Sequence, residues 1–115
     1  MARAGKPAES EEHYREVVRL KPEYVAARMA LADVLAKQGN SADAVEQLRQ
    51  ALKQQPRSVM VYERMGDVEK SRGDASAARE AYQKALEYAS DPSERKRLRR
   101  KLESGRSPRS TEPRP

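Results

Sequence analysis

Residues 25–56 read VAARMALADVLAKQGNSADAVEQLRQALKQQP, and residues 59–90 read VMVYERMGDVEKSRGDASAAREAYQKALEYAS. Eight residues recur between the two stretches at a spacing of 34: Val25 and Val59, Asp33 and Asp67, Val34 and Val68, Gly39 and Gly73, Ala44 and Ala78, Glu46 and Glu80, Ala51 and Ala85, Leu52 and Leu86. A fixed period of this size is typical of helical repeat proteins, in which stacked units bury a shared core. The period therefore predicts an all-α fold and favours a binding scaffold over an enzyme.

Each stretch carries apolar residues at helical spacing on both sides of a short polar break. In residues 25–56 the break is Lys-Gln-Gly-Asn, where Gly39 can end a helix in the left-handed conformation and Asn40 can cap the next helix. Gly73 and Asp74 occupy the same places in residues 59–90. Each stretch is thus predicted to form two antiparallel helices.

The period also extends toward the N-terminus. A shift of 34 residues aligns Tyr14, Val17, Val18 and Pro22 with Leu48, Ala51, Leu52 and Pro56. Residues 8–22 are therefore predicted to form the second helix of an earlier repeat, preceded by a flexible segment, 1–7. Without a first helix beside them, Tyr14, Val17 and Val18 are expected to expose an apolar patch. Such a patch favours association with a second copy of the chain, or a place in a longer solenoid.

After the repeats, Asp91-Pro92-Ser93-Glu94 is a strong helix start, with a capping acid and a proline at the first helical position. The predicted helix, 91–104, has a narrow apolar stripe made of Leu98 and Leu102. It is expected to cap the stack with a polar outer face. Residues 105–115 are polar and rich in proline and are predicted to be disordered.

Charge is unevenly distributed over the chain, whose formal net charge is +6. Residues 1–90 carry 15 Lys or Arg against 14 Asp or Glu, whereas residues 91–115 carry 9 against 4. The basic cluster comprises Arg95, Lys96, Arg97, Arg99, Arg100 and Lys101. It could contact nucleic acid or an anionic membrane. We favour a solvated cap, because the cations surround the helix and no aromatic residue in the segment could stack on a base.

Other features exclude several functional classes. Cysteine is absent, so disulfides and thiolate metal sites are excluded. His13 is the single histidine, and no Gly-rich phosphate loop is present. We therefore expect no catalytic residues, no metal, no cofactor and no small-molecule substrate. No apolar run approaches the roughly 20 residues that span a bilayer, and the N-terminus lacks a signal-peptide core. A cytoplasmic protein is the resulting expectation.

The repeats resemble the tetratricopeptide repeat over about residues 8–90. That family has small residues at repeat positions 8, 20 and 27, a large apolar residue at 24 and proline at 32. These positions hold Ala32, Ala44, Ala51, Leu48 and Pro56 in the first unit, and Gly66, Ala78, Ala85, Tyr82 and the departing Ser90 in the second. The resemblance implies a short right-handed α-solenoid whose first helices line a concave groove.

Members of this family bind peptides or partner helices in the groove. Mapped onto this sequence, the resemblance places Met29, Asp33, Lys37, Met60, Glu63, Arg64, Asp67 and Lys70 there. Asp33 and Asp67 would repel a terminal carboxylate, so we expect a partner segment that carries Lys or Arg. The alternative for these residues is a solvated helix face, with Asp33 and Lys37 as an i,i+4 pair.

Overall fold

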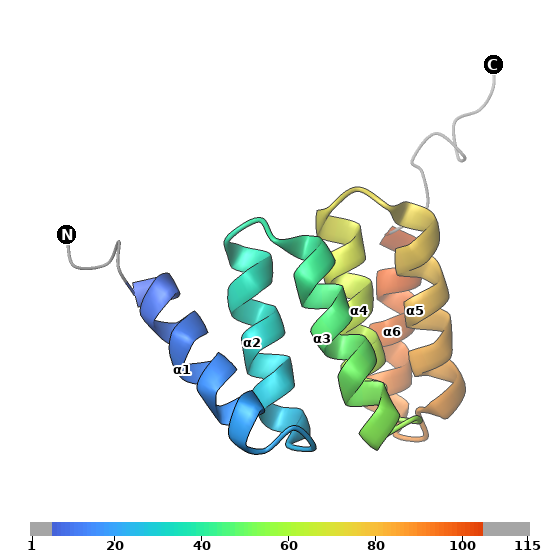
Figure 1. Cartoon of the computed structure of the whole chain (residues 1–115). Coiled ribbons are helices and arrows are strands. Elements are labelled where there is room, and N and C mark those ends of the chain that lie inside the picture. The colour runs from blue at the N-terminus through green and yellow to red at the C-terminus, as the bar shows by residue number, and fades with distance from the viewer. Residues whose placement is uncertain (1–5, 105–115) are drawn as a thin grey trace.

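The computed structural model describes residues 6–104, which form six helices and no strand (Figure 1). The helices are α1 (Lys6–Leu20), α2 (Val25–Lys37), α3 (Ser41–Gln54), α4 (Val59–Ser71), α5 (Ala75–Tyr88) and α6 (Pro92–Ser104). The all-α prediction is confirmed. Two of the seven residues predicted as a flexible N-terminus belong to α1, and the predicted tail, 105–115, lies outside the described residues.

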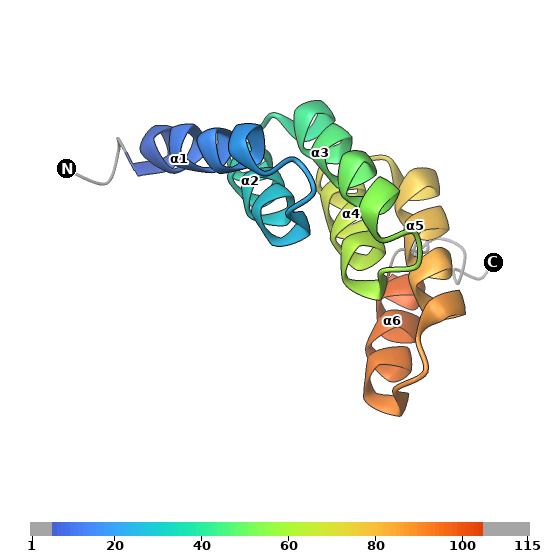
Figure 2. The same ribbon diagram turned by 60° about the horizontal axis from the view of Figure 1, so that its bottom comes forward.

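The helices form a short curved stack in chain order. Helices α2 and α3 pair closely, as do α4 and α5, and each pair is one predicted repeat. Helix α1 packs on α2, and α6 packs on α5. Figure 2 shows α2, α4 and α6 along the inner side of the curve, with α3 and α5 along the outer side. The first helices of the repeats therefore share one surface.

Two glycine turns join the paired helices. Gly39 and Gly73 adopt φ of 87° and 89°, a left-handed conformation that strains residues with a Cβ. The amide of the following residue then folds back onto the preceding helix: Asn40 N lies 2.8 Å from Leu35 O. The Asp74 side chain caps α5 by accepting a hydrogen bond from Ala77 N at 3.0 Å. The predicted cap by Asn40 is only positional, since its side chain makes no capping hydrogen bond.

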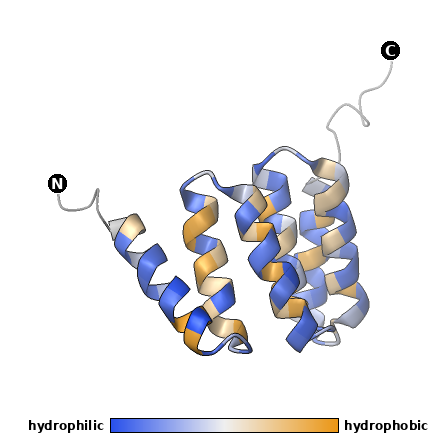
Figure 3. Ribbon diagram, viewed as in Figure 1, coloured by the Kyte–Doolittle hydropathy of each residue, from blue (hydrophilic) through white to orange (hydrophobic). Residues whose placement is uncertain are grey.

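Buried apolar residues form two clusters. Figure 3 shows hydrophobic residues recurring along the helices among hydrophilic ones. The first cluster is centred on the repeat 25–56, and the second lies between α5 and α6 around Leu98, which is fully buried. Tyr14 and Val18 pack against the first cluster, and Val17 is half-buried. The apolar patch expected on α1 is therefore reduced, because α2 covers one side of that helix.

Candidate functional site

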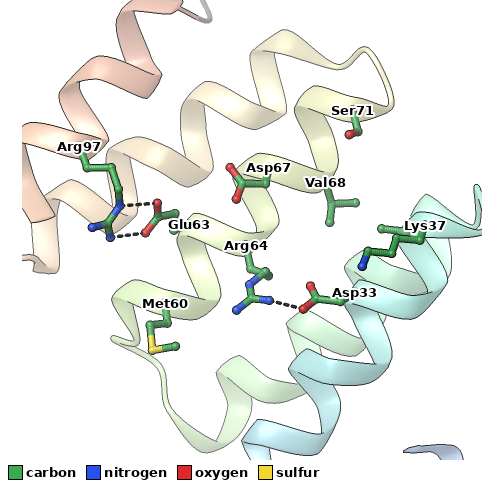
Figure 4. Close-up of a pocket in the computed structure, with 10 residues that line it drawn as sticks. Asp33, Lys37, Met60, Glu63, Arg64, Asp67, Val68, Ser71 and Arg97 are labelled. Atoms are coloured by element: carbon green, nitrogen blue, oxygen red, sulfur yellow. Dashed lines mark hydrogen bonds and ion pairs between the residues drawn. The ribbon is translucent and has the colours of Figure 1, made fainter. Parts of the chain in front are cut away.

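The inner side of the curve holds a cavity of about 510 Å³, drawn in Figure 4. Its lining comes from α2, α4 and α6: Asp33, Ala36, Lys37, Met60, Glu63, Arg64, Asp67, Val68, Ser71 and Arg97. Six of the eight predicted groove residues line it, all except Met29 and Lys70. Helical spacing explains the convergence, because residues three or four apart along α2 or α4 lie on one face.

The carboxylate of Asp33 joins α2 to α4. Arg64 donates a hydrogen bond from its guanidinium to Asp33 Oδ2 (Figure 4). The Asp33 side chain nevertheless keeps 40% of its surface exposed. A carboxylate accepts about four hydrogen bonds, so Asp33 is oriented by Arg64 while it retains capacity for a partner.

Glu63 is the most enclosed of the three acids, with 13% of its side chain exposed. Arg97 of α6 donates two hydrogen bonds to its carboxylate, at 2.8 Å from Nε and 2.7 Å from a terminal nitrogen. Lys101 Nζ adds a third at 2.7 Å. These bonds, that from Arg97 first, outweigh burial and hold the pKa of Glu63 at about 2. Glu63 is thus ionised at neutral pH, and its carboxylate already accepts hydrogen bonds from Arg97 and Lys101.

Asp67 is shared between a cation and a tyrosine. Lys101 Nζ lies 3.0 Å from Asp67 Oδ1, and the Tyr82 hydroxyl donates to the same oxygen at 2.6 Å. Burial raises the pKa of Tyr82, and the bond to Asp67 adds to the rise. Burial acts to lower the pKa of Lys101, but its bonds to Glu63 and Asp67 outweigh that effect and raise it. Asp67 remains 45% exposed.

Three of the side-chain contacts between α4 and α6 follow the repeat period. Arg97 binds Glu63, Lys101 binds Asp67, and Ser104 accepts from Lys70 at 3.2 Å, each 34 residues apart. Helix α6 therefore occupies the place of the first helix of a further repeat, and does more than close the end of the stack. A comparison of identical residues at a spacing of 34 misses this continuation. The acids Glu63 and Asp67 of α4 correspond to the bases Arg97 and Lys101 of α6.

The cavity lining is consequently balanced in charge. Asp33, Glu63 and Asp67 stand against Lys37, Arg64 and Arg97. The sequence suggested a surface on which carboxylates are open to a basic partner. Helix α6 supplies cations to Glu63 and Asp67, and of the three acids Asp33 and Asp67 keep the larger exposed surface. Among residues 6–104, no group of three or more His, Cys, Asp or Glu is arranged to hold a metal ion.

The two remaining groove candidates lie elsewhere. Met29 is 7% exposed and belongs to the first core cluster, at the border of a separate cavity of about 550 Å³ that Tyr24 and Met60 also line. Met60 is 57% exposed and lines both cavities, so its side chain offers apolar surface to a molecule bound in either cavity. Lys70 lies beyond the first cavity and contacts Ser104.

The basic cluster of α6 divides into two sets. Arg97 and Lys101 face α4, and Arg95 donates to the last carbonyls of α5, those of Leu86 at 2.8 Å and Ala89 at 2.9 Å. Lys96, Arg99 and Arg100 are exposed. Their i, i+3, i+4 spacing places them on one stripe. The six cations as a set lie on several sides of α6, as expected from the sequence.

None of the helices within residues 6–104 is long and apolar enough to cross a membrane. Residues 1–105 match a family model described as "Tetratricopeptide repeat-like domain". No curated protein sequence matches the chain.

Several solved structures are similar in fold. MamA has 20% sequence identity and a TM-score of 0.74, with 90% of this chain and 59% of that chain covered. This chain thus spans less than two thirds of MamA. PcrH in complex with the chaperone binding region of PopD has 15% identity and a TM-score of 0.79, covering 90% and 81%. The first TPR of Spaghetti (RPAP3), bound to the HSP90 peptide SRMEEVD, has 17% identity and a TM-score of 0.71, covering 89% and 82%.

The family match spans nearly all of the chain and agrees with the paired helices, the glycine turns and the shared inner surface. The chain belongs to the tetratricopeptide repeat-like family.

Proposed function

We propose that this chain is a non-catalytic protein-interaction scaffold that binds a peptide or a partner helix in the inner groove. The observation that carries the proposal is that the carboxylates of Asp33 and Asp67 are both oriented and partly exposed. Each carboxylate is held by a cation of the chain, yet 40% and 45% of their side chains stay exposed at the cavity. Oriented acceptors with spare capacity favour binding, because less side-chain freedom is lost when a partner arrives.

The partner segment that fits carries Lys or Arg side chains and at least one apolar side chain. The cations would address Asp33 and Asp67, and the apolar group would cover the exposed Met60. Peptide complexes among the structural neighbours support this mode of binding. The peptide bound to RPAP3 is acidic, whereas the two accessible aspartates here favour the opposite charge.

A pair of fluorescent peptides tests the proposal. Both have one length and one apolar residue, and they differ in carrying two Lys or two Glu. We expect the Lys peptide to bind more tightly by fluorescence anisotropy. The double variant Asp33→Asn and Asp67→Asn should weaken it about tenfold, since two exposed ion pairs contribute roughly 0.5–1 kcal/mol each.

A matched control carries the same charge change on the outer helix. Glu80→Gln and Glu87→Gln lie on α5, are exposed, and do not line the groove. This variant should bind the Lys peptide as the original chain does. Equal binding of both peptides, unchanged in the aspartate variant, would refute the charge preference. Absence of binding by either peptide in the groove would refute the site.

A second candidate is an adaptor that binds nucleic acid or an anionic membrane through residues 95–101. The exposed stripe of Lys96, Arg99 and Arg100 supports it. If Lys96, Arg99 and Arg100, which form no ion pair within residues 6–104, each contact a phosphate, the logarithm of oligonucleotide affinity should fall with the logarithm of salt at a slope of about −3. Groove binding that includes Met60 should depend less on salt. Salt titration therefore separates the two candidates.

Self-association at the N-terminal end is also part of the proposal. The residues concerned are Tyr14, Val17 and Val18, of which Tyr14 and Val18 pack against the core beside α2. Val17 and the exposed Leu20 keep apolar surface for such a contact.

A further inference from the structure

Helices α1 and α6 are two different halves of a repeat, located at opposite ends of the stack (Figures 1 and 2). Helix α6 takes the place of a first helix, because its contacts to α4 follow the period of 34. Helix α1 takes the place of a second helix, because it packs on α2 as α3 packs on α4. Among the described residues, neither has the partner helix that would complete its repeat.

The open face of α1 is visible in the burial of equivalent positions. Ala44 and Ala51 of α3 are fully buried between α2 and α4. The equivalent residues of α1, Ser10 and Val17, are only partly buried. Leu20, at the end of the helix, is 63% exposed. The exposed area is what a first helix would cover.

The open face of α6 is its basic stripe. In α2 the equivalent positions face α3 and are closed: Leu31, Ala32 and Leu35 are at most 1% exposed. In α6 these positions hold Arg99, Arg100 and Glu103, all exposed. A second helix placed against α6 would therefore lie on charged side chains.

The pair α4 and α5 shows which positions would meet. A cleft of about 490 Å³ beside this pair is lined by Tyr62, Met65 and Glu69 from α4, by Ala77, Glu80, Ala81, Gln83, Lys84 and Glu87 from α5, and by Arg49 from α3. A shift by one period carries the first three to Lys96, Arg99 and Glu103 of α6. A shift back by two periods carries the six residues of α5 to Glu9, Glu12, His13, Arg15, Glu16 and Arg19 of α1. Lys96 and Arg99, beside Glu103, would thus face Glu9, Glu12 and Glu16, while Arg15 and Arg19 of α1 are paired with Glu11 and Glu16 of their own helix.

The charges at these positions are available. Within residues 6–104, Glu9 and Glu12 form no ion pair, and neither do Lys96 and Arg99. Glu16 is bound only by the exposed Arg19, one turn away. Opposite charges on surfaces that already have complementary places in the stack are the basis of specific docking.

We propose that α6 of one copy receives α1 of a second copy, so that the two helices complete a repeat between molecules. This proposal extends the self-association of α1 by naming its counter-surface, and it does not depend on groove binding. Arg100 replaces the small residue that lets α5 approach α4 at Gly66. The helices would therefore lie farther apart than α4 and α5, with long charged side chains between them.

The contact uses different surfaces on the two copies, so it is heterologous. A heterologous contact that does not close into a ring adds copies without limit. The average mass in solution should therefore rise continuously with concentration, and should not stop at a dimer. Because ion pairs carry the contact, salt should dissolve it.

Light scattering at rising concentration tests the proposal. The mass should exceed that of the 13.0 kDa monomer at about 0.01 M salt, where the Debye length is about 30 Å, and return to it near 1 M, where it is about 3 Å. Variant A carries Lys96→Glu and Arg99→Glu, and variant B carries Glu9→Lys and Glu12→Lys. Each alone should stay monomeric, since one of its two faces is reversed.

Mixing the variants separates this arrangement from others. The intact α6 of B meets the intact α1 of A, and the reversed α6 of A meets the reversed α1 of B, so an equal mixture should associate with the two variants alternating, although neither variant associates alone. One chain with all four changes should associate again, because both charges are exchanged. A control with Lys53→Glu and Arg57→Glu, which are exposed and away from both faces, should associate like the original chain.

Three results would overturn the proposal. They are a monomer at low salt and about 0.5 mM chain, association of variant A alone, and a mixture of A and B without complexes. If oligonucleotide binding is lost in A while association is unchanged, α6 serves nucleic acid instead. None of the four residues lines the groove, so peptide binding by A and B tests the proposed function separately.

Discussion

Gly66→Ala is expected to destabilise the chain, although alanine is the better helix former. An ideal Cβ at Gly66 would lie 2.5 Å from Cε1 and 2.6 Å from Cδ1 of Tyr82. The ring cannot easily move, because Tyr82 is 2% exposed and its hydroxyl is bound to Asp67 at 2.6 Å. In the first repeat the equivalent pair is Ala32 and Leu48. There the residue on the first helix is larger than glycine and the residue on the second helix is smaller than tyrosine.

The size of the effect follows from two opposed terms. Replacing glycine by alanine within a helix gains about 1 kcal/mol. Inserting a methyl group into a closed core costs about 1–3 kcal/mol. At Gly66 the contact is far inside van der Waals distance, so we expect the upper part of that range and a net loss of about 1–2 kcal/mol. For a chain of this size the melting temperature should fall by about 5–10 °C.

A double-mutant cycle identifies the cause. Tyr82→Leu alone should destabilise, because it removes ring volume and the bond to Asp67. In the double variant with Gly66→Ala, the methyl group enters the space that the ring vacates, as in the pair Ala32 and Leu48. Urea unfolding should then give a favourable coupling energy of about 1 kcal/mol or more. A Gly66→Ala variant that is more stable than the original chain, or a coupling near zero, would refute the reasoning.

The ion pairs and helix caps give two further predictions. The pKa of Glu63 is lowered from 4.5 to about 2 on folding, so the unfolded chain binds the proton more tightly and the stabilisation is lost as pH falls through that range. The loss in the free energy of unfolding should be about 1–2 kcal/mol after allowance for solvent screening. Urea unfolding at pH 7 and pH 3 should show a smaller loss of stability for Glu63→Gln than for the original chain. Asp74→Ala should cost about 1 kcal/mol because it removes the cap of Ala77 N. Asn40→Ala should cost much less, since the Asn40 side chain caps nothing, and equal losses in thermal unfolding would contradict this.

The repeat architecture was predictable because it rests on local chemistry that recurs. Gly39 and Gly73 mark turns that need a left-handed residue, and both adopt that conformation. The spacing of apolar residues fixed which helices pair. Six of the ten residues that line the inner cavity were among the eight expected there. Met29 was misplaced because it lies near the boundary between groove and core, where spacing alone cannot decide burial.

The ion pairs were not predictable from local patterns. Arg97 reaches Glu63 across 34 residues, and Arg64 reaches Asp33 across 31, so each depends on how whole helices dock. The basic run of α6 gave no indication that Arg95 would bind the last carbonyls of α5. Side chains with several rotatable bonds can face many partners, and the packing of α6 decides between them.

The docking of α6 also decides which acids of the groove are free for a partner. Glu63 already accepts three hydrogen bonds from Arg97 and Lys101 and is 13% exposed, so an incoming cation would have to displace α6 from α4. Asp33 and Asp67 keep open surface and can accept a further bond without that displacement. Their side chains lie on neighbouring first helices, at the same position of successive repeats. In the proposed binding mode, the segment would therefore run across α2 and α4 and present its cations at the spacing of the stack, which a peptide lying along a single helix could not do.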